Sequence, residues 1–203
     1  MDETRIAQGM MALAALDPRI RAAHDLLGDP PPRLRPPGYG TLLRAIVSQQ
    51  ISTTAAASIW GRLETMLGDV ETPHAVLAAD FDTLRAAGLS RAKIAYAQSL
   101  AAHVAEGSLP IHDLPEDDEE AIRLLSSVKG LGRWSAEIYL MFAEGRADIF
   151  PAGDLAVQVQ AGRLLLDGER PSEKALRELA EPWRPHRGVA ALFLWHCYNA
   201  PPL

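Results

Sequence analysis

A glycine-bracketed turn is the first part of this sequence whose residue types could do chemistry. In the segment 124–136, Gly130 and Gly132 flank one apolar residue between two stretches of helical pattern. Glycine lets the chain turn with positive φ, and the absence of a Cβ atom lets another backbone approach closely. The helix that follows begins with free N–H groups, which make an anion site beside Lys129 and Arg133. The turn is predicted either to bind a phosphate or simply to join two packed helices.

The carboxylate of Asp154 is a second candidate. It follows the proline- and glycine-containing segment 148–153 and stands where a new helical pattern begins. An aspartate in this place is expected to cap the helix by accepting a backbone N–H. A helix N-terminus also stabilises an anion, and a catalytic carboxylate has to be one. Capping alone and catalysis both account for Asp154 at this point.

The elements that must position these residues are helical, and no convincing strand interrupts them. Helix start signals alternate with helix-ending glycines; the start signals are Thr41, Ser52 or Thr53, Thr72 with Pro73, Asp80 and Ser90. The acidic run 117–120 is expected to open another helix by complementing its dipole. Helices are predicted over 3–16, 18–27, 41–47, 52–68, 90–107, 133–143, 155–166, 173–180 and 186–199. The predicted fold class is all-α.

Composition limits the possible functions of the chain. Its 203 residues carry a net charge of −6, which weighs against a simple electrostatic binder of nucleic acid. The lone Cys197 excludes an intramolecular disulfide framework, an all-cysteine zinc site and a four-cysteine iron–sulfur cluster. No apolar run is long enough for a membrane span, and the start is acidic rather than a signal peptide. A cytoplasmic protein with no membrane partner is expected.

Three segments in a fixed order resemble one family. Residues 44–52 read RAIVSQQIS, residues 132–136 read GRWSA and residues 192–195 read LFLW. With the hairpin, the Gly/Pro loop and Asp154, they resemble the helix-hairpin-helix–Gly/Pro–Asp superfamily of DNA glycosylases. The match is to the 3-methyladenine DNA glycosylase II (AlkA-like) family, in a compact form without its N-terminal β-domain, and it runs from about residue 39 to 198.

This resemblance implies a two-lobed helical fold with the active-site cleft between the lobes. The whole chain, 1–203, is then one glycosylase domain. Within it, residues 1–38 hold N-terminal helices and a proline-rich connector that pack with the C-terminal helices. Residues 39–145 form a helical lobe with the hairpin at 124–136, and residues 146–203 carry the catalytic loop and the last helices.

The resemblance also assigns roles to single residues in catalysis. Asp154 is the catalytic carboxylate, which stabilises the positive charge that grows on the sugar as the base leaves. Trp134 and Trp195 wall the pocket for a flipped base, although Trp134 is also explained by core filling. Gln49 and Gln50 sit where the family places its DNA wedge, and a polar helix end explains them equally. Trp60 and Trp183 have no such match and are expected to be packing residues.

Contacts to the DNA backbone are assigned to the hairpin. The residues expected to bind phosphate are Lys129, Gly130, Gly132, Arg133 and Ser135. The carbonyls of Ser126, Val128 and Leu131 are expected to coordinate a structural Na⁺ or K⁺, and no cofactor is otherwise required, an iron–sulfur cluster included. Five basic residues could gather on one face, with the acidic run 117–120 opposite; they are Lys129, Arg133, Arg163, Arg184 and Arg187.

One departure from the family concerns the reaction product. Bifunctional members carry a nucleophilic lysine directly after the Gly-x-Gly-Arg stretch, where this chain has Trp134. Indole cannot form a Schiff base, so no β-lyase activity is expected. The resulting prediction is a monomeric, monofunctional glycosylase that removes alkylated bases of the 3-methyladenine and 7-methylguanine type from double-stranded DNA. A non-catalytic DNA-binding module and a glycosylase for a neutral damaged base are the alternatives.

Overall fold

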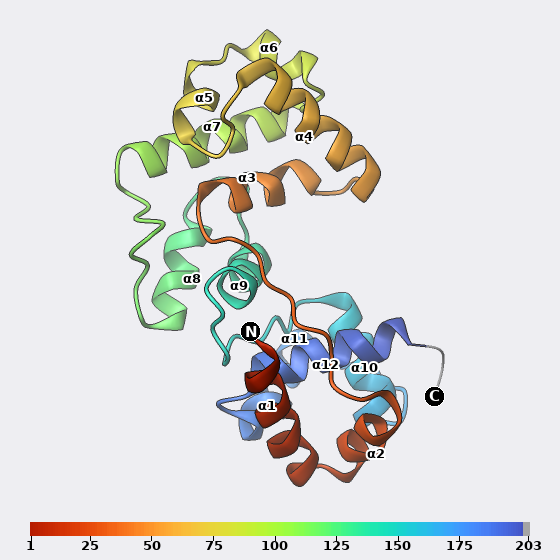
Figure 1. Cartoon of the computed structure of the whole chain (residues 1–203). Helices are drawn as coiled ribbons and strands as arrows, with labels where there is room; N and C mark the ends of the chain where they lie inside the picture. Colours follow the sequence, from red (N-terminus) through yellow and green to blue (C-terminus); the bar gives the residue numbers. More distant parts are fainter. Residues whose placement is uncertain (201–203) are drawn as a thin grey trace. The chain divides into compact units, whose positions relative to one another are not determined.

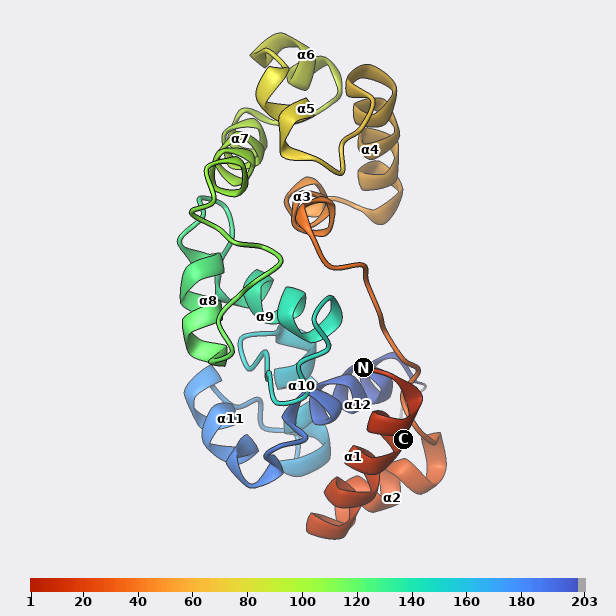
Figure 2. The ribbon, with the colours of Figure 1, turned by 60° about the vertical axis from the view of Figure 1, so that its left-hand side comes forward.

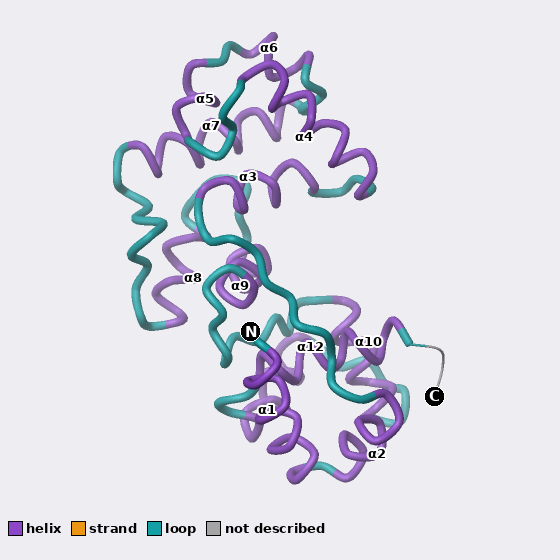
Figure 3. Tube along the Cα trace, in the orientation of Figure 1, coloured by secondary structure: helices purple, strands orange, loops and turns teal. Residues whose placement is uncertain are grey.

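A computed structural model describes residues 1–200 of the chain, and every regular element in that range is a helix (Figures 1 and 3). The predicted all-α fold class is therefore confirmed. The helices are α1 (Glu3–Leu16), α2 (Pro18–Leu27), α3 (Tyr39–Ser48), α4 (Thr53–Leu67), α5 (Pro73–Ala78), α6 (Phe81–Ala86), α7 (Arg91–Ala105), α8 (Asp118–Ser126), α9 (Arg133–Phe142), α10 (Leu155–Leu165), α11 (Glu173–Ala180), the 3₁₀ helix η1 (Glu181–Trp183) and α12 (Arg187–Asn199). None of those helices is long and apolar enough to cross a membrane.

The chain divides into two compact units, each described here by itself. The terminal unit comprises Met1–Leu34 and Leu140–Leu203, and the central unit comprises Arg35–Tyr139. The boundaries predicted from the sequence were at 38 and 145, four and six residues beyond these points. The predicted segment 146–203 also reaches residues 201–203, which lie outside the described range.

In the central unit, α3 packs against α4 and α7, while α5 and α6 also pack against α7. Side-chain caps begin three of its helices as the sequence predicts: Ser52 for α4, Asp80 for α6 and Ser90 for α7. Asp117 caps α8 by accepting from the N–H of Glu120, which confirms the helix-starting role of the acidic run.

The start of α3 differs from the prediction. The helix begins at Tyr39 after Gly38, whose φ is 123°, and not at Thr41. The Thr41 hydroxyl instead donates to the carbonyl of Pro36 at 2.6 Å. Threonine can hydrogen-bond in either place, and the proline-rich segment before α3 is not helical, so its carbonyls are not used by a helix.

In the terminal unit, α12 is the central element. It packs against α10 and α1, and α2 lies beside both α1 and α10 (Figure 2). Most of its residues, from Gly188 to Trp195, are buried. Asp17 caps α2 ahead of Pro18 by accepting from the N–H of Arg19. This packing fixes one face of α12 next to the start of α10, where Asp154 stands.

Candidate active site and DNA-contacting turn

The loop that carries Asp154 is braced by its own hydrogen bonds. The N–H of Ala152 donates to the carbonyl of Phe150, and the N–H of Asp154 donates to that of Pro151, both at 2.9 Å. The side-chain amide of Gln158 returns from α10 to the Ala152 carbonyl at 2.8 Å. The backbone position of Asp154 is therefore set by the loop and by the helix that follows it.

The Asp154 carboxylate receives two N–H donors at one oxygen. Its Oδ1 accepts from the backbone N–H of Val157 at 3.0 Å, which is the predicted N-cap. The same Oδ1 accepts from the indole Nε1 of Trp195, also at 3.0 Å. Two donors from different elements hold the side chain in one orientation, as a preorganised catalytic anion requires.

Trp195 is placed to orient this carboxylate. Its side chain is buried, with 8% of its surface exposed, and its ring packs 5.8 Å from that of Phe142. The Arg33 guanidinium lies 5.9 Å from the ring centre. The role of Trp195 as a wall of the base pocket stays a prediction. Its hydrogen bond to Asp154 was not predicted from the sequence. The signal for it was present, because a buried tryptophan usually finds a partner for its N–H.

In the central unit, the structure brings the predicted wedge residues together with Trp134, one of the two predicted pocket residues. Gln49, Gln50, Trp134 and Ser135 line one cavity of about 380 Å³. Trp134 leaves 48% of its surface exposed there, which does not fit pure core filling. Arg35 lines the same cavity, and its guanidinium makes no hydrogen bond or ion pair within the described residues. Sequence reasoning missed Arg35 because it lies in the proline-rich connector, far from any motif.

The two glycines of the hairpin are needed for different reasons. Gly130 has φ of 91°, and a Cβ atom added to it would lie 2.2 Å from the ring of Tyr96. A Cβ atom on Gly132 would meet nothing within 4 Å. Leu131, the apolar residue between them, is buried. The backbone conformation and the ring of Tyr96 thus require glycine at position 130, whereas Gly132 leaves open space next to the first turn of α9.

The carbonyls predicted to hold a monovalent cation fit that role in part. The Val128 carbonyl accepts from the N–H of Leu131 at 3.0 Å, which leaves it one further lone pair. Oxygen ligands of this kind suit a hard cation.

Comparison with known proteins shows which family this chain belongs to. Residues 43–185 match the HhH-GPD superfamily of base excision DNA repair proteins. The chain belongs to this superfamily. It is 31% identical over 199 residues to DNA-3-methyladenine glycosylase 1 of Schizosaccharomyces pombe, covering 95% of this chain and 87% of that protein.

Solved structures of the superfamily agree with this assignment. The DNA-3-methyladenine glycosidase of Bacillus halodurans has a TM-score of 0.88 and 32% identity, covering 95% of this chain and 89% of that one. The 3-methyladenine DNA glycosylase Mag1 of Schizosaccharomyces pombe, in complex with abasic DNA, has a TM-score of 0.78 and 30% identity. That match covers 93% of this chain and 95% of the other. The resemblance to the 3-methyladenine glycosylase branch is confirmed.

The HhH-GPD hairpin of this chain differs from the prediction in the surroundings of Arg133. Its guanidinium donates to both carboxylate oxygens of Glu119 and to the buried carboxylate of Glu137, at 2.9 Å for the latter. Hydrogen bonds to Glu119, with the nearby negative charges, raise the pKa of Arg133 above its ordinary value. Glu119 belongs to the acidic run, so the expectation that this run lies opposite Arg133 is wrong. A phosphate contact by Arg133 stays a prediction. A DNA phosphate would have to compete with the carboxylates of Glu119 and Glu137 for this guanidinium.

The other basic residues predicted to lie on the DNA-binding face differ in whether they already pair with carboxylates. Arg184 and Arg187 both pair with Asp148 and Glu181 within the terminal unit, so they do not form a free basic patch. Lys129 is exposed next to Gly130 and makes no ion pair within the described residues. Of the hairpin cations, Lys129 is therefore the one ready for a phosphate.

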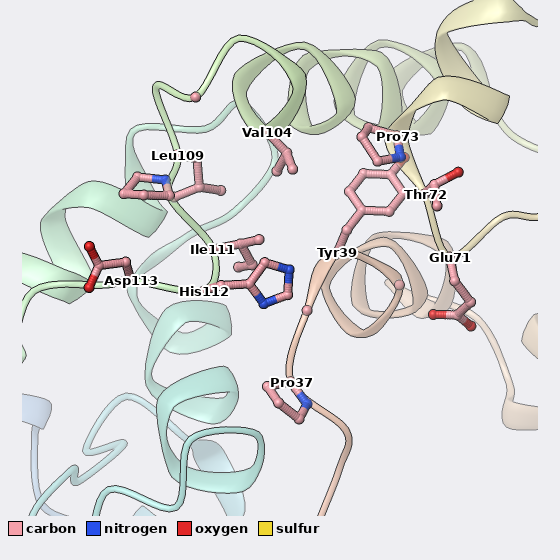
Figure 4. A pocket seen from close by; sticks show the side chains of 14 residues that line it. Pro37, Tyr39, Glu71, Thr72, Pro73, Val104, Leu109, Ile111, His112 and Asp113 are labelled. Carbon is pink, nitrogen blue, oxygen red and sulfur yellow. The ribbon is translucent and has the colours of Figure 1, made fainter.

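Two remaining features lie away from the predicted site. Trp60 and Trp183 are buried, which confirms their reading as packing residues. A cavity of about 460 Å³ opens at the N-terminal end of α3, where Tyr39 and His112 face it (Figure 4). None of the predicted site residues lines that cavity, so it is separate from the wedge and hairpin.

Proposed function

We propose that this protein is a monofunctional DNA glycosylase that flips alkylated bases out of double-stranded DNA and hydrolyses their N-glycosidic bonds. The observation that carries the proposal is the Asp154 carboxylate, held by two N–H donors at the start of α10 in an HhH-GPD chain. The relatives named as DNA-3-methyladenine glycosylases support the substrate class. Action as a cytoplasmic monomer on DNA is part of the same proposal.

The chemistry follows from where charge develops. As the N-glycosidic bond breaks, the sugar becomes oxocarbenium-like, and a fixed carboxylate stabilises that charge and orients the attacking water. Trp195 and Val157 hold Oδ1 of Asp154 in place throughout. Bases such as 3-methyladenine and 7-methylguanine already carry a positive charge in DNA, so they leave without a strong general acid.

The central unit supplies the grip and the pocket. Gly132 leaves room for a DNA phosphate to approach the N–H groups of α9, and Lys129 contributes a cation beside it. Na⁺ or K⁺ bound by the hairpin carbonyls would add positive charge to the same turn. The exposed indole of Trp134 offers a face to a cationic base, an attraction of about 0.5–2 kcal/mol. Gln50 is the residue proposed to fill the vacated space in the duplex.

The absence of lyase chemistry follows from Trp134. Strand cleavage through a Schiff base needs an amine, and the position after Gly-x-Gly-Arg holds an indole. The product is therefore an intact strand with an abasic site.

The test is base release, measured by chromatography, from DNA treated with a methylating agent. Asp154→Asn should abolish release and leave binding to an abasic-site analogue largely intact, because the amide is nearly isosteric and can still accept the capping bond. A variant that keeps more than about a tenth of the wild-type rate, a loss below about 1.4 kcal/mol, contradicts the catalytic role. A wild-type protein that releases no base would favour the non-catalytic DNA-binding module, with Asp154 only as a cap.

A glycosylase for a neutral damaged base is the second candidate, and Arg35 favours it. A guanidinium without an ionic partner in the cavity of Trp134 repels a cationic base and can donate to the carbonyl of a neutral one. Rates on matched duplexes with 7-methylguanine and with hypoxanthine separate the two candidates. Faster release of hypoxanthine would replace alkylated bases as the main substrate.

A further inference from the structure

The loop between α3 and α4 is held by two side-chain hydrogen bonds where it leaves α3. This wedge loop comprises residues 49–52 and contains Gln50. At its start, the side-chain Nε2 of Gln49 donates to the backbone carbonyl of Gly130 at 2.8 Å, across 81 residues of sequence. Just before it, the Nζ of Lys93 donates to the Val47 carbonyl at 2.7 Å. Neither contact belongs to the regular hydrogen bonds of a helix.

Lys93 replaces a missing partner at the end of α3. That helix has no basic residue in its own last turn. The Ser48 hydroxyl and the Gln49 N–H donate to the carbonyls of Ala45 and Ile46, and the Val47 carbonyl is one of the last four, for which a helix has no regular donor. The ammonium group of Lys93 supplies a donor and a positive charge at this end, where the helix dipole is negative. The backbone of Lys93 is fixed in turn, because its N–H donates to the Ser90 cap of α7.

The same turn of α7 also reaches the hairpin. Tyr96 lies three residues after Lys93, on the same face of the helix. Its ring fills the space where a Cβ atom of Gly130 would be. Gln49 binds the carbonyl of that same Gly130. The end of α3, the start of α7 and the hairpin therefore meet around one backbone position.

Gln50 stands directly after these contacts in a left-handed conformation, with φ of 56°. A residue other than glycine keeps this conformation only where its surroundings determine it. The side chain is exposed, and Ile51 beside it is 38% exposed. The loop thus holds two exposed side chains on a backbone that its neighbours fix.

We propose that Gln49 and Lys93 are positioning residues that hold the wedge loop in its inserting conformation before DNA binds. Because Gln49 bonds the hairpin turn itself, a phosphate gripped at the hairpin places Gln50 in register with the duplex. A loop already ordered does not lose that conformational freedom on binding. The inference rests on the proposed function, since it assigns a role within base flipping.

The test compares a lesion that is paired with an opposite base and a lesion that has no opposite base. Single-turnover release of 7-methylguanine is measured opposite cytosine and opposite an abasic-site analogue, where the lesion has no pairing partner to lose. Gln49→Met keeps the length of the side chain and removes its donor. We expect release from the paired duplex to fall about threefold to tenfold, as for one neutral hydrogen bond, and release from the unpaired site to stay within twofold.

Gln98→Met is the matched control. Gln98 lies half-buried in α7 of the same unit and makes no hydrogen bond within the described residues, so both rates should remain those of wild type. Equal losses on the two substrates by Gln49→Met, or no loss on either, would overturn the inference. A melting curve accompanies each variant.

Lys93 provides the second variant. Lys93→Met should lower the paired rate selectively, and Lys93→Arg should restore it, because a guanidinium also donates to the end of α3. If Gln49→Met does not fold, the Lys93 pair decides the question by the same ratio. A wild-type protein that releases no base at all would reject the proposed function, whereas an active wild type with an unchanged ratio in the variants rejects this inference alone.

Discussion

The terminal and central units hold their functional groups in different ways. In the terminal unit, the proposed chemistry depends on one carboxylate, and both of its identified donors act on a single oxygen of Asp154. In the central unit, the functional surface is mostly backbone and exposed side chains, arranged around Gly130. A substitution in the first unit should therefore change the rate of a bound complex, and one in the second should change how the complex forms.

The two hairpin glycines give the largest expected effect within one unit. Gly130→Ala should lower the free energy of unfolding by about 1–3 kcal/mol from backbone strain, with the clash against Tyr96 added. Gly132→Ala should cost less than about 1 kcal/mol, because its Cβ atom enters open space. Urea or thermal unfolding measures both. Equal destabilisation would mean that Gly132, too, is required by the fold.

Gly132, whose substitution should cost little stability, should matter for DNA binding. Gly132→Val should fold and yet bind DNA at least about tenfold more weakly, a loss of about 1.4 kcal/mol. A phosphate carries no information about the lesion, so damaged and undamaged duplexes should lose affinity alike. If a folded Gly132→Val binds as tightly as wild type, the hairpin is a structural connector.

Trp195→Phe should separate orientation of the carboxylate from stacking on the base. The ring is kept and the N–H to Asp154 is lost, so single-turnover excision should fall between about 10- and 100-fold, as for a hydrogen bond to a charged group. Cationic and neutral lesions should be affected alike, with KM unchanged. A rise in KM confined to 7-methylguanine would show instead that Trp195 walls the pocket.

Trp134→Leu should have a smaller and selective effect. Losing the indole face should lower kcat/KM for 7-methylguanine by about 2- to 30-fold, the equivalent of about 0.5–2 kcal/mol of cation–π attraction. The value for a neutral base such as hypoxanthine should change less. Equal losses on the two lesions would assign Trp134 to packing.

The smallest expected effect is none at all. Borohydride added during the reaction should trap no covalent protein–DNA adduct, because Trp134 occupies the position of the nucleophilic lysine. Gel electrophoresis of the protein detects a trapped adduct. One that appears would show that another amine of the chain attacks the sugar.

The sequence predicted most interactions between residues close in the chain and missed those between residues far apart. Caps such as Asp154, Ser90 and Asp80 depend on residues three positions apart, and each was predicted correctly. The start of α3 was wrong because Gly38 and Pro36 are equally local signals that compete with Thr41.

The long-range contacts could not be read from spacing. Arg133 pairs with Glu119, which is 14 residues away, and Gln49 bonds Gly130 across 81 residues. Charge patterns show which residues are able to pair, but tertiary packing decides which do. Arg35 was missed for the same reason, since only the fold places this connector residue beside Trp134.

The most direct test of the division between chemistry and grip is single-turnover base release at saturating protein, with Asp154→Asn and Gly132→Val compared side by side. The account predicts that Gly132→Val, once saturated, releases base within about threefold of the wild-type rate, while Asp154→Asn falls at least about 100-fold, which corresponds to about 2.7 kcal/mol. Binding to an abasic-site analogue should show the opposite order. If Asp154→Asn recovers its rate at saturation, or Gly132→Val remains slow there, the two units do not divide the work in this way.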